Sequence, residues 1–182
     1  MDATSRARQL RLMAFDVDGV LTDGSIWYAD DGSELKAFNA LDGAGMKMLE
    51  KAGIAVAIIT GRKAPCVEHR MRNLGIPHLY QDVHDKVAGL QGILDRLGIE
   101  AAQAGFMGDD VMDLAAMAAC GFSAAPANAH DAVLRHATLV TTKRGGQGAV
   151  REVCDFILAA QGQLEAAIAP WTRIGEQAYL EA

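Results

Sequence analysis

The chain has 182 residues, of which 51% are hydrophobic and 22% are charged, so its composition is that of one globular domain over residues 1–182 and excludes a disordered chain. Its formal net charge of −6 argues against binding to nucleic acid or to anionic membranes, because both need clustered cations. The sequence has no apolar stretch of signal or membrane-spanning length, and we therefore expect a cytoplasmic protein.

Apolar runs alternate with helical patterns along most of the chain. The runs at 12–17, 54–60 and 104–107 lack polar alternation, which is typical of strands covered on both faces. Shorter strands are expected at 78–80, 122–124 and 138–140, and helices at 45–51, 63–74, 85–97, 110–118, 129–135 and 149–159. This order predicts an α/β fold with a doubly wound, Rossmann-like parallel sheet. The tail at 161–182 is expected to be a helix with an arm, or partly disordered.

Residues 25–38 interrupt this alternation and predict a projecting β-hairpin. Asp31-Gly32 lies between two strand-like runs, which is a strong signal for a two-residue turn. With that turn, one face would carry Ile26, Tyr28, Leu35 and Ala37, and the other Trp27, Lys36 and Phe38. Because both faces would present large apolar groups, we expect the hairpin to form a subunit interface. The alternative is that it folds over the edge of its own sheet.

Two aspartates with one valine between them end the first predicted strand. Residues two apart in an extended chain point to the same side, so Asp16 and Asp18 would repel each other unless a proton or a metal ion lies there. Ligands of doubly wound folds bind at the carboxyl ends of the strands. Other polar groups are expected at that edge: Thr60, Gly61 and Arg62, then Lys86, then Asp109, Asp110 and Asp113.

These residues resemble the four motifs of the haloacid dehalogenase superfamily of phosphohydrolases. The motifs are DVDGVLTDG, ITGRK, Lys86 and GDDVMD. The segments FNALDGAGMKML, FSAAPANAH and GGQGAVREVCDFIL extend the similarity over about residues 11–160 to the 3-deoxy-D-manno-octulosonate 8-phosphate (KDO 8-phosphate) phosphatase family. This resemblance implies a Mg²⁺-dependent, homotetrameric phosphoric monoester hydrolase of lipopolysaccharide biosynthesis.

The chemistry of phosphate monoesters, taken with the resemblance, gives each motif a role. Asp16 would attack phosphorus and form an aspartyl phosphate, and Asp18 would protonate the leaving oxygen and then activate water. The carboxylates of Asp16 and Asp109, with the backbone carbonyl of Asp18, would bind Mg²⁺. Thr60 would hydrogen-bond the phosphoryl group, and Lys86 would neutralise its charge.

Neighbouring residues would support this site. The backbone of Gly61 would also bind the phosphoryl group. Asp110 and Asp113 would orient waters and Lys86, although Asp110 as a direct metal ligand stays open. Gly145, Gly146 and Gly148 (the second, third and fifth residues of RGGQG) permit close backbone approach, or else form a flexible loop before a helix.

Substrate selection must depend on few residues, because no insertion between the motifs is long enough for a cap domain over the site. The resemblance implies a substrate-binding set of Asp18, Asn39, Ala40, Leu41, Asp42, Gly43, Lys47, Gly61, Arg62, Arg70 and Lys86. The cations Lys47, Arg62 and Arg70 would suit a sugar acid that carries a carboxylate besides its phosphate. Relatives often have arginine where this chain has Leu41.

Two other functions stay open. A phosphatase for nine-carbon sugar-acid 9-phosphates (KDN or sialic acid) would use the same chemistry, because sequence patterns do not count substrate carbons. A phospho-acceptor signalling module also uses acidic strand ends, threonine, lysine and Mg²⁺ on a similar fold. The aspartate pair at the first strand argues against that module, which normally carries its phosphorylated aspartate in the middle of the chain.

Overall fold

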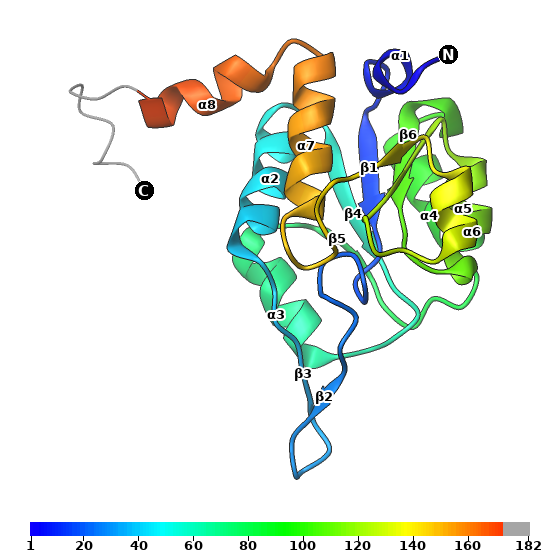
Figure 1. The fold of residues 1–182 in the computed structure, drawn as a ribbon, viewed down its shortest axis with the longest axis vertical. Helices are drawn as coiled ribbons and strands as arrows, with labels where there is room; N and C mark the ends of the chain where they lie inside the picture. Colours follow the sequence, from blue (N-terminus) through cyan, green and yellow to red (C-terminus); the bar gives the residue numbers. More distant parts are fainter. Residues whose placement is uncertain (173–182) are drawn as a thin grey trace.

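A parallel sheet of six strands forms the centre of the molecule in the computed structural model, which describes residues 1–172 (Figure 1). Its order, β5-β4-β1-β6-β7-β8, runs outward from β1 in both directions, as in a doubly wound fold. The strands are β1 (Leu12–Phe15), β4 (Ala55–Ile59), β5 (His78–Tyr80), β6 (Ala104–Met107), β7 (Phe122–Ala125) and β8 (Leu139–Val140). The predicted fold class is therefore confirmed.

Helices cover both faces of this sheet (Figure 1). One layer contains α1 (Ala3–Ala7), α2 (Ala40–Lys51), α3 (Pro65–Leu74) and α7 (Ala149–Ala160); the other contains α4 (Lys86–Leu97), α5 (Leu114–Ala119) and α6 (Asp131–His136). The central strand β1 contacts both hydrophobic cores, which explains why its sequence is apolar throughout. Met13 and Phe15 belong to the first core, whereas Leu12 and Ala14 belong to the second.

The structure adds detail that the sequence patterns did not give. The helix expected at 110–118 begins as a 3₁₀ turn, η2 (Val111–Asp113), before α5, and a second such turn, η1 (Ala101–Gln103), precedes β6. Within the predicted tail, α8 (Leu164–Thr172) follows α7, while the arm expected after it lies outside the described residues. Among residues 1–172, no helix combines the length and apolar character needed to cross a membrane.

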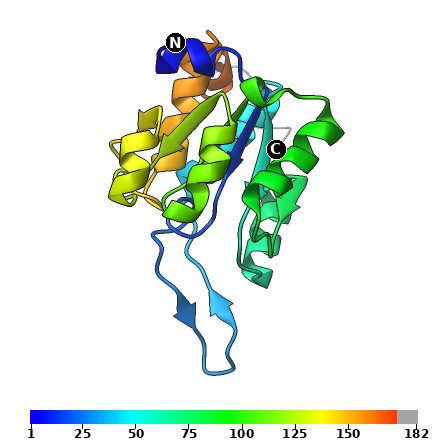
Figure 2. The same cartoon turned by 90° about the vertical axis from the view of Figure 1, so that its right-hand side faces the viewer.

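The predicted hairpin projects from the carboxyl edge of the sheet, as Figure 2 shows. Its strands β2 (Trp27–Tyr28) and β3 (Glu34–Leu35) pair antiparallel, with Trp27 opposite Leu35 and Tyr28 opposite Glu34. The predicted assignment of its faces was wrong by one residue, because the loop between the strands has three residues, 30–32. Ala29 therefore donates to the carbonyl of Ser33, and Gly32 takes a φ of 83°. Trp27 thus shares a face with Leu35, and Tyr28 with Glu34.

Candidate active site

The carboxyl ends of β1, β4 and β6 bring the predicted motif residues to one edge of the sheet. Asp16 follows β1, and its backbone N–H continues the ladder by donating to Met107 at 3.0 Å. Thr60 follows β4, is buried, and donates its backbone N–H to Tyr80 at 3.0 Å. Asp109 lies in the loop after β6. Parallel pairing of β1 with both β4 and β6 therefore assembles three distant motifs.

A glycine allows the loop after β1 to touch the loop after β6. Gly19 has a φ of 86°, and a Cβ there would lie 2.0 Å from Oδ2 of Asp109. The loop turns at once, because the carbonyl of Val17 accepts hydrogen bonds from Leu21 at 2.9 Å and from Thr22 at 3.0 Å. A glycine is thus required after the aspartate pair, because any side chain at position 19 would overlap the carboxylate of Asp109.

Three aspartates and one lysine meet at this edge. Carboxylate oxygens of Asp16, Asp109 and Asp113 lie within 4.8 Å of one another. The Nζ of Lys86, the first residue of α4, lies 3.0 Å from Oδ2 of Asp16 and 2.5 Å from Oδ1 of Asp113. The structure thus brings Lys86 beside Asp16 and Asp113, where the sequence placed it.

Asp113 is held by protein groups on both of its oxygens. Oδ1 accepts from Lys86, and Oδ2 accepts from the backbone N–H groups of Asp109 at 3.0 Å and Asp110 at 3.2 Å. In contrast, Oδ1 of Asp16 is buried and has no hydrogen-bond partner within the described chain. The exposed Asp110 caps η2 by accepting from Val111 at 2.7 Å. Asp113 is therefore placed to orient its neighbours, while Asp16 keeps an oxygen available.

Burial and mutual repulsion oppose ionisation of two of the aspartates. Burial, followed by the charge of Asp113, raises the pKa of Asp16 to about 6, although Lys86 opposes this shift. Burial and the charges of Asp16 and Asp113 raise the pKa of Asp109 to about 7. Burial alone would lower the pKa of Lys86, but the charges of Asp16 and Asp113 outweigh it and raise this pKa.

This donor set fits a hard divalent cation. Mg²⁺ prefers oxygen ligands, usually one or two carboxylates, and keeps part of its water shell. The buried, unpartnered oxygen of Asp16 lies beside Asp109. A bound cation would offset both the burial and the mutual repulsion that raise the pKa values of these two aspartates. Asp113 also comes within reach, but its oxygens are engaged. Asp16 and Asp109 are the carboxylates best placed to hold the ion.

The predicted substrate residues on α2 lie in different environments. Asn39 caps α2 by accepting from Leu41 at 2.8 Å, and Leu41 is exposed. Asp42 is buried and turned toward α7, where it accepts from the backbone of Arg151 at 2.8 Å; burial raises its pKa. Arg70 donates to the Asn39 carbonyl at 3.2 Å.

The remaining predicted substrate residues of this segment are small or solvent-exposed. Lys47 is exposed, as is Ala40 at the first position of α2. Gly43 is buried, and a Cβ there would lie 2.3 Å from Nη2 of Arg70, so it permits close packing of that arginine. Gly61 is half-buried directly after Thr60. Within this set, the structure places Asn39 and Arg70 in direct contact and turns Asp42 away from them.

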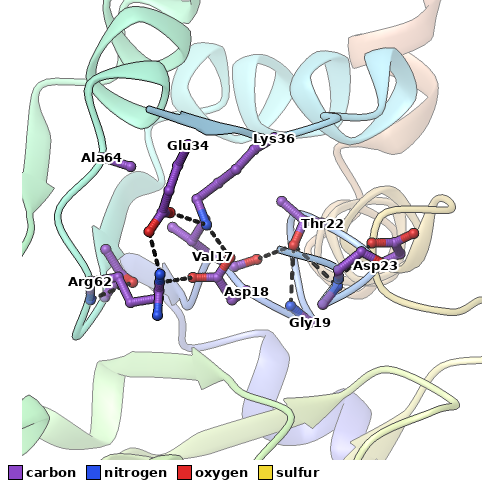
Figure 3. Close-up of polar contacts among 12 residues, drawn as sticks. Val17, Asp18, Gly19, Thr22, Asp23, Glu34, Lys36, Arg62 and Ala64 are labelled. Carbon is purple, nitrogen blue, oxygen red and sulfur yellow. Dashed lines mark hydrogen bonds and ion pairs between the residues drawn. The ribbon is translucent and has the colours of Figure 1, made fainter. Parts of the chain in front are cut away.

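The hairpin contributes two residues that the sequence reasoning did not assign to the site. Lys36 forms an ion pair with Oδ1 of Asp18, and Glu34 forms one with Arg62 (Figure 3). The Nε of Arg62 lies 3.9 Å from Oδ2 of Asp18. The signal in the sequence was Glu34 and Lys36 at alternate positions of a strand, but the assumed two-residue turn placed Lys36 on the wrong face.

The glycine-rich loop before α7 supports the loop after β1. A Cβ at Gly145 would lie 1.7 Å from the carbonyl oxygen of Gly19, so the close approach allowed by the sequence is confirmed. Gly146 has a φ of 66° and donates to the Val20 carbonyl at 2.9 Å. Asn128 accepts from the N–H of Gly145 at 2.8 Å. This segment therefore holds the loop that carries Asp18.

Comparisons with known proteins agree with this arrangement. Residues 77–153 match the family model of haloacid dehalogenase-like hydrolases. The 3-deoxy-D-manno-octulosonate 8-phosphate phosphatase of Yersinia pestis is 48% identical to this chain over 91% of it and 89% of the relative. The corresponding Escherichia coli enzyme is 46% identical over 91% of this chain and 88% of its own.

Solved structures give the same result. The Yersinia pestis phosphatase matches with a TM-score of 0.89, at 48% identity, over 90% of this chain and 89% of its own. The enzyme of Moraxella catarrhalis, solved with magnesium, phosphate and KDO, matches with a TM-score of 0.90, at 43% identity, over 93% of this chain and 97% of its own. The chain therefore belongs to the 3-deoxy-D-manno-octulosonate 8-phosphate phosphatase family of haloacid dehalogenase-like hydrolases.

Proposed function

We propose that this protein is a Mg²⁺-dependent phosphatase that hydrolyses KDO 8-phosphate to KDO and phosphate, a step of lipopolysaccharide biosynthesis in the cytoplasm. The observation that carries this proposal is the cluster of Asp16, Asp109, Asp113 and Lys86 at one edge of the sheet. It occurs in a chain that is 43% identical to a phosphatase solved with KDO, phosphate and magnesium.

In the first step, an oxygen of Asp16 bonds to phosphorus while the bond from phosphorus to the sugar oxygen breaks. Asp18 gives its proton to that sugar oxygen, so the sugar leaves as a neutral alcohol. The resulting aspartyl phosphate divides one slow hydrolysis into two easier reactions. Lys86, 3.0 Å from Asp16, lies where it can offset the charge of the nucleophile and of the phosphoryl oxygens.

In the second step, water attacks phosphorus of the aspartyl phosphate and Asp18 accepts a proton from that water. The bond from phosphorus to Asp16 breaks, which releases phosphate and restores both carboxyl groups. The buried Thr60 and the backbone of Gly61 follow β4 and would hydrogen-bond the phosphoryl oxygens. Asp113 keeps Lys86 oriented through the 2.5 Å contact.

A magnesium ion held by Asp16, Asp109 and the backbone carbonyl of Asp18 would supply positive charge against the phosphate oxygens. The proposed substrate also carries a carboxylate, and Arg62, Arg70 and Lys47 are the cations we assign to it. Both arginines contact the returning half of the hairpin: Arg62 pairs with Glu34, and the guanidinium carbon of Arg70 lies 6.0 Å from the centroid of the Phe38 ring. Leu41, exposed at the start of α2, carries no charge and leaves these cations to recognise the acid.

We propose that the protein works as a homotetramer joined through the hairpin. Four large apolar side chains of residues 25–38 are exposed: Ile26, Trp27, Tyr28 and Leu35, of which Trp27 is 63% exposed. Burial of such groups contributes about 1.5–3 kcal/mol per side chain. Because the hairpin stands beside Asp18, a neighbouring subunit docked on it would also wall the active site, which no cap domain covers within the described residues.

A substrate comparison tests this function. Initial rates of phosphate release are measured with Mg²⁺ for KDO 8-phosphate, for nine-carbon sugar-acid 9-phosphates and for p-nitrophenyl phosphate. We expect kcat/KM for KDO 8-phosphate to exceed that for the nine-carbon substrates by about tenfold or more. A preference for a nine-carbon substrate would replace the proposed substrate. Stoichiometric phosphorylation without turnover would instead indicate a phospho-acceptor module.

A further inference from the structure

Four charged side chains close a ring between the hairpin and the active site (Figure 3). Asp18 pairs with Lys36 through Oδ1, and Lys36 reaches Oε2 of Glu34 at 3.3 Å. Glu34 pairs through Oε1 with Arg62, whose Nε lies 3.9 Å from Oδ2 of Asp18. Glu34 and Lys36 belong to the hairpin, whereas Asp18 and Arg62 lie in the loops after β1 and β4. The ring therefore connects the hairpin to the loop that carries Asp18.

The burial of Lys36 distinguishes this ring from ordinary surface ion pairs. The Lys36 side chain is 1% exposed, whereas the neighbouring Leu35 is 57% exposed. A buried ammonium group must be paired, and the removal of one partner from such a pair is costly. The exposed leucine is free to contact another subunit, whereas the side chain of Lys36 faces inward, where Asp18 and Glu34 pair with it. Lys36 therefore acts toward the site.

The register of the hairpin explains how both charged residues reach inward. Tyr28 lies opposite Glu34, so the two side chains share a face, and the Nη2 of Arg62 donates to the hydroxyl of Tyr28 at 3.1 Å. Lys36, two residues after Glu34, points to the same side. Hydrogen bonds from Arg62 lower the pKa of Glu34, while those to Glu34 and Tyr28 raise the pKa of Arg62, so both stay charged.

We propose that Lys36 is a positioning residue that holds the carboxylate of Asp18 in the orientation needed for proton transfer, with Glu34 fixing Lys36. This inference rests on the proposed function, because it assigns Asp18 the proton transfers. Lys36 occupies Oδ1 and leaves Oδ2 buried without a hydrogen-bond partner in the described chain. That oxygen is the one available to exchange a proton. Without Lys36, the nearest cation to Asp18 is Arg62, which would draw the carboxylate to the other side.

The test is a double-mutant cycle of Lys36→Met with Asp18→Asn. Lys36→Met alone is expected to lower kcat for KDO 8-phosphate by about 10- to 100-fold, with a much smaller change in KM, because orientation and not binding is lost. In the Asp18→Asn background, the same change should lower kcat no further, since Lys36 acts through Asp18. Lys36→Arg, which keeps the charge, should recover part of the loss.

Controls separate this role from stability. Lys51→Met removes an exposed lysine at the end of α2 and should leave kcat unchanged. Thermal unfolding and sedimentation of Lys36→Met verify that the folded, assembled protein is assayed. A full additional loss of kcat in the Asp18→Asn background would overturn the proposal, as would a loss confined to KM. If the protein hydrolysed p-nitrophenyl phosphate but not KDO 8-phosphate, the proposed substrate would fail, and the cycle would still decide the role of Lys36 with the generic ester.

Discussion

The sheet edge and the hairpin differ in how they place charged groups. At the sheet edge, Asp16, Lys86 and Asp113 are buried and lie next to strands or helices whose backbones are fixed by the parallel ladder. The hairpin has only two residues in each strand and exposes its large apolar side chains, yet it buries the side chain of Lys36. The first region holds its charges within the core, and the second holds them through ion pairs and a hydrogen bond to residues of the neighbouring loops.

This difference separates two parts of the proposed activity. In the proposed mechanism the core would supply the nucleophile, the metal ligands and the phosphoryl contacts, so its variants should lose hydrolysis of every ester. In the proposed tetramer the outer surface of the hairpin would supply the subunit contact and a wall for the substrate, so variants there should affect the sugar acid most. The base of the hairpin, where Glu34 and Lys36 meet Arg62 and Asp18, connects the two parts.

Loss of the nucleophile should have the largest effect. Asp16→Asn is expected to lower kcat by about 10⁴-fold or more for KDO 8-phosphate and for p-nitrophenyl phosphate, because the covalent route is removed. The fold should persist, since the change removes a repelling charge from a buried cluster. Asp95→Asn, at an exposed position of α4, is the matched control. Near-normal turnover of Asp16→Asn would contradict the assignment of the nucleophile.

A methyl group in the supporting loop should have the next largest effect. In Gly145→Ala the new Cβ would lie 1.7 Å from the carbonyl oxygen of Gly19, so the loop that carries Asp18 must move. We expect kcat to fall by about 100-fold for both esters. Gly92→Ala is the control, because nothing lies within 4 Å of its Cβ and alanine favours the helix. Unchanged kcat in Gly145→Ala would show that the two loops do not need their contact.

A rise in pH should lower the free energy of unfolding of the metal-free protein, whereas Mg²⁺ should raise it. In metal-free protein the pKa values of Asp16 and Asp109, about 6 and about 7, lie above the usual 3.8. The unfolded chain then releases these protons at lower pH than the folded protein, so the free energy of unfolding should fall as pH rises from about 4 to about 7. Mg²⁺ should restore stability above that range.

Urea unfolding with a chelator and with Mg²⁺, at pH 5 and pH 8, measures both effects. We expect the chelated protein to lose at least about 1 kcal/mol between the two pH values, since each pKa unit corresponds to about 1.4 kcal/mol. A chelated protein that was more stable at pH 8 than at pH 5 would contradict the placement of these carboxylates. Equal stabilisation by Mg²⁺ at both pH values would contradict their role as ligands.

Changes at the outer face of the hairpin should have the smallest effect on chemistry. Trp27→Ser with Leu35→Ser removes apolar groups that share one face, and should give smaller species in sedimentation. Use of KDO 8-phosphate should weaken several-fold, with a lesser change for p-nitrophenyl phosphate. Asp30→Asn, at an exposed loop position, should change neither. A double variant that stayed fully assembled would show that this face is not the interface.

The sequence predicted the sheet and the site core well because each motif follows a strand. Parallel strands end at one edge, so the apolar runs before Asp16, Thr60 and Asp109 were enough to bring these residues together. The glycine-rich sequence also suggested a close backbone approach at Gly145. It did not indicate which group approaches, because the contact with the carbonyl of Gly19 depends on how distant segments pack. Such pairings leave no local pattern.

The hairpin faces could not be predicted in the same way. The Asp31-Gly32 pair indicated a two-residue turn, but the structure uses residues 30–32, and one added loop residue reverses the side chains of one strand. Lys36 therefore reaches Asp18, a contact between residues 18 positions apart that no motif carries. The α1 helix was likewise not expected, because five residues give too short a periodic pattern.

The most direct test of the account is detection of phosphate on Asp16 during turnover. The Asp18→Asn variant, which should hydrolyse the intermediate slowly, is mixed with Mg²⁺ and p-nitrophenyl phosphate, whose leaving group needs no proton from Asp18. The reaction is quenched in acid within one turnover and analysed by peptide mass spectrometry. The account predicts one phosphoryl group on Asp16, formed with a stoichiometric burst of p-nitrophenol and absent when a chelator is present. A phosphoryl group on another residue, or p-nitrophenol release without any phosphorylated peptide, would contradict it.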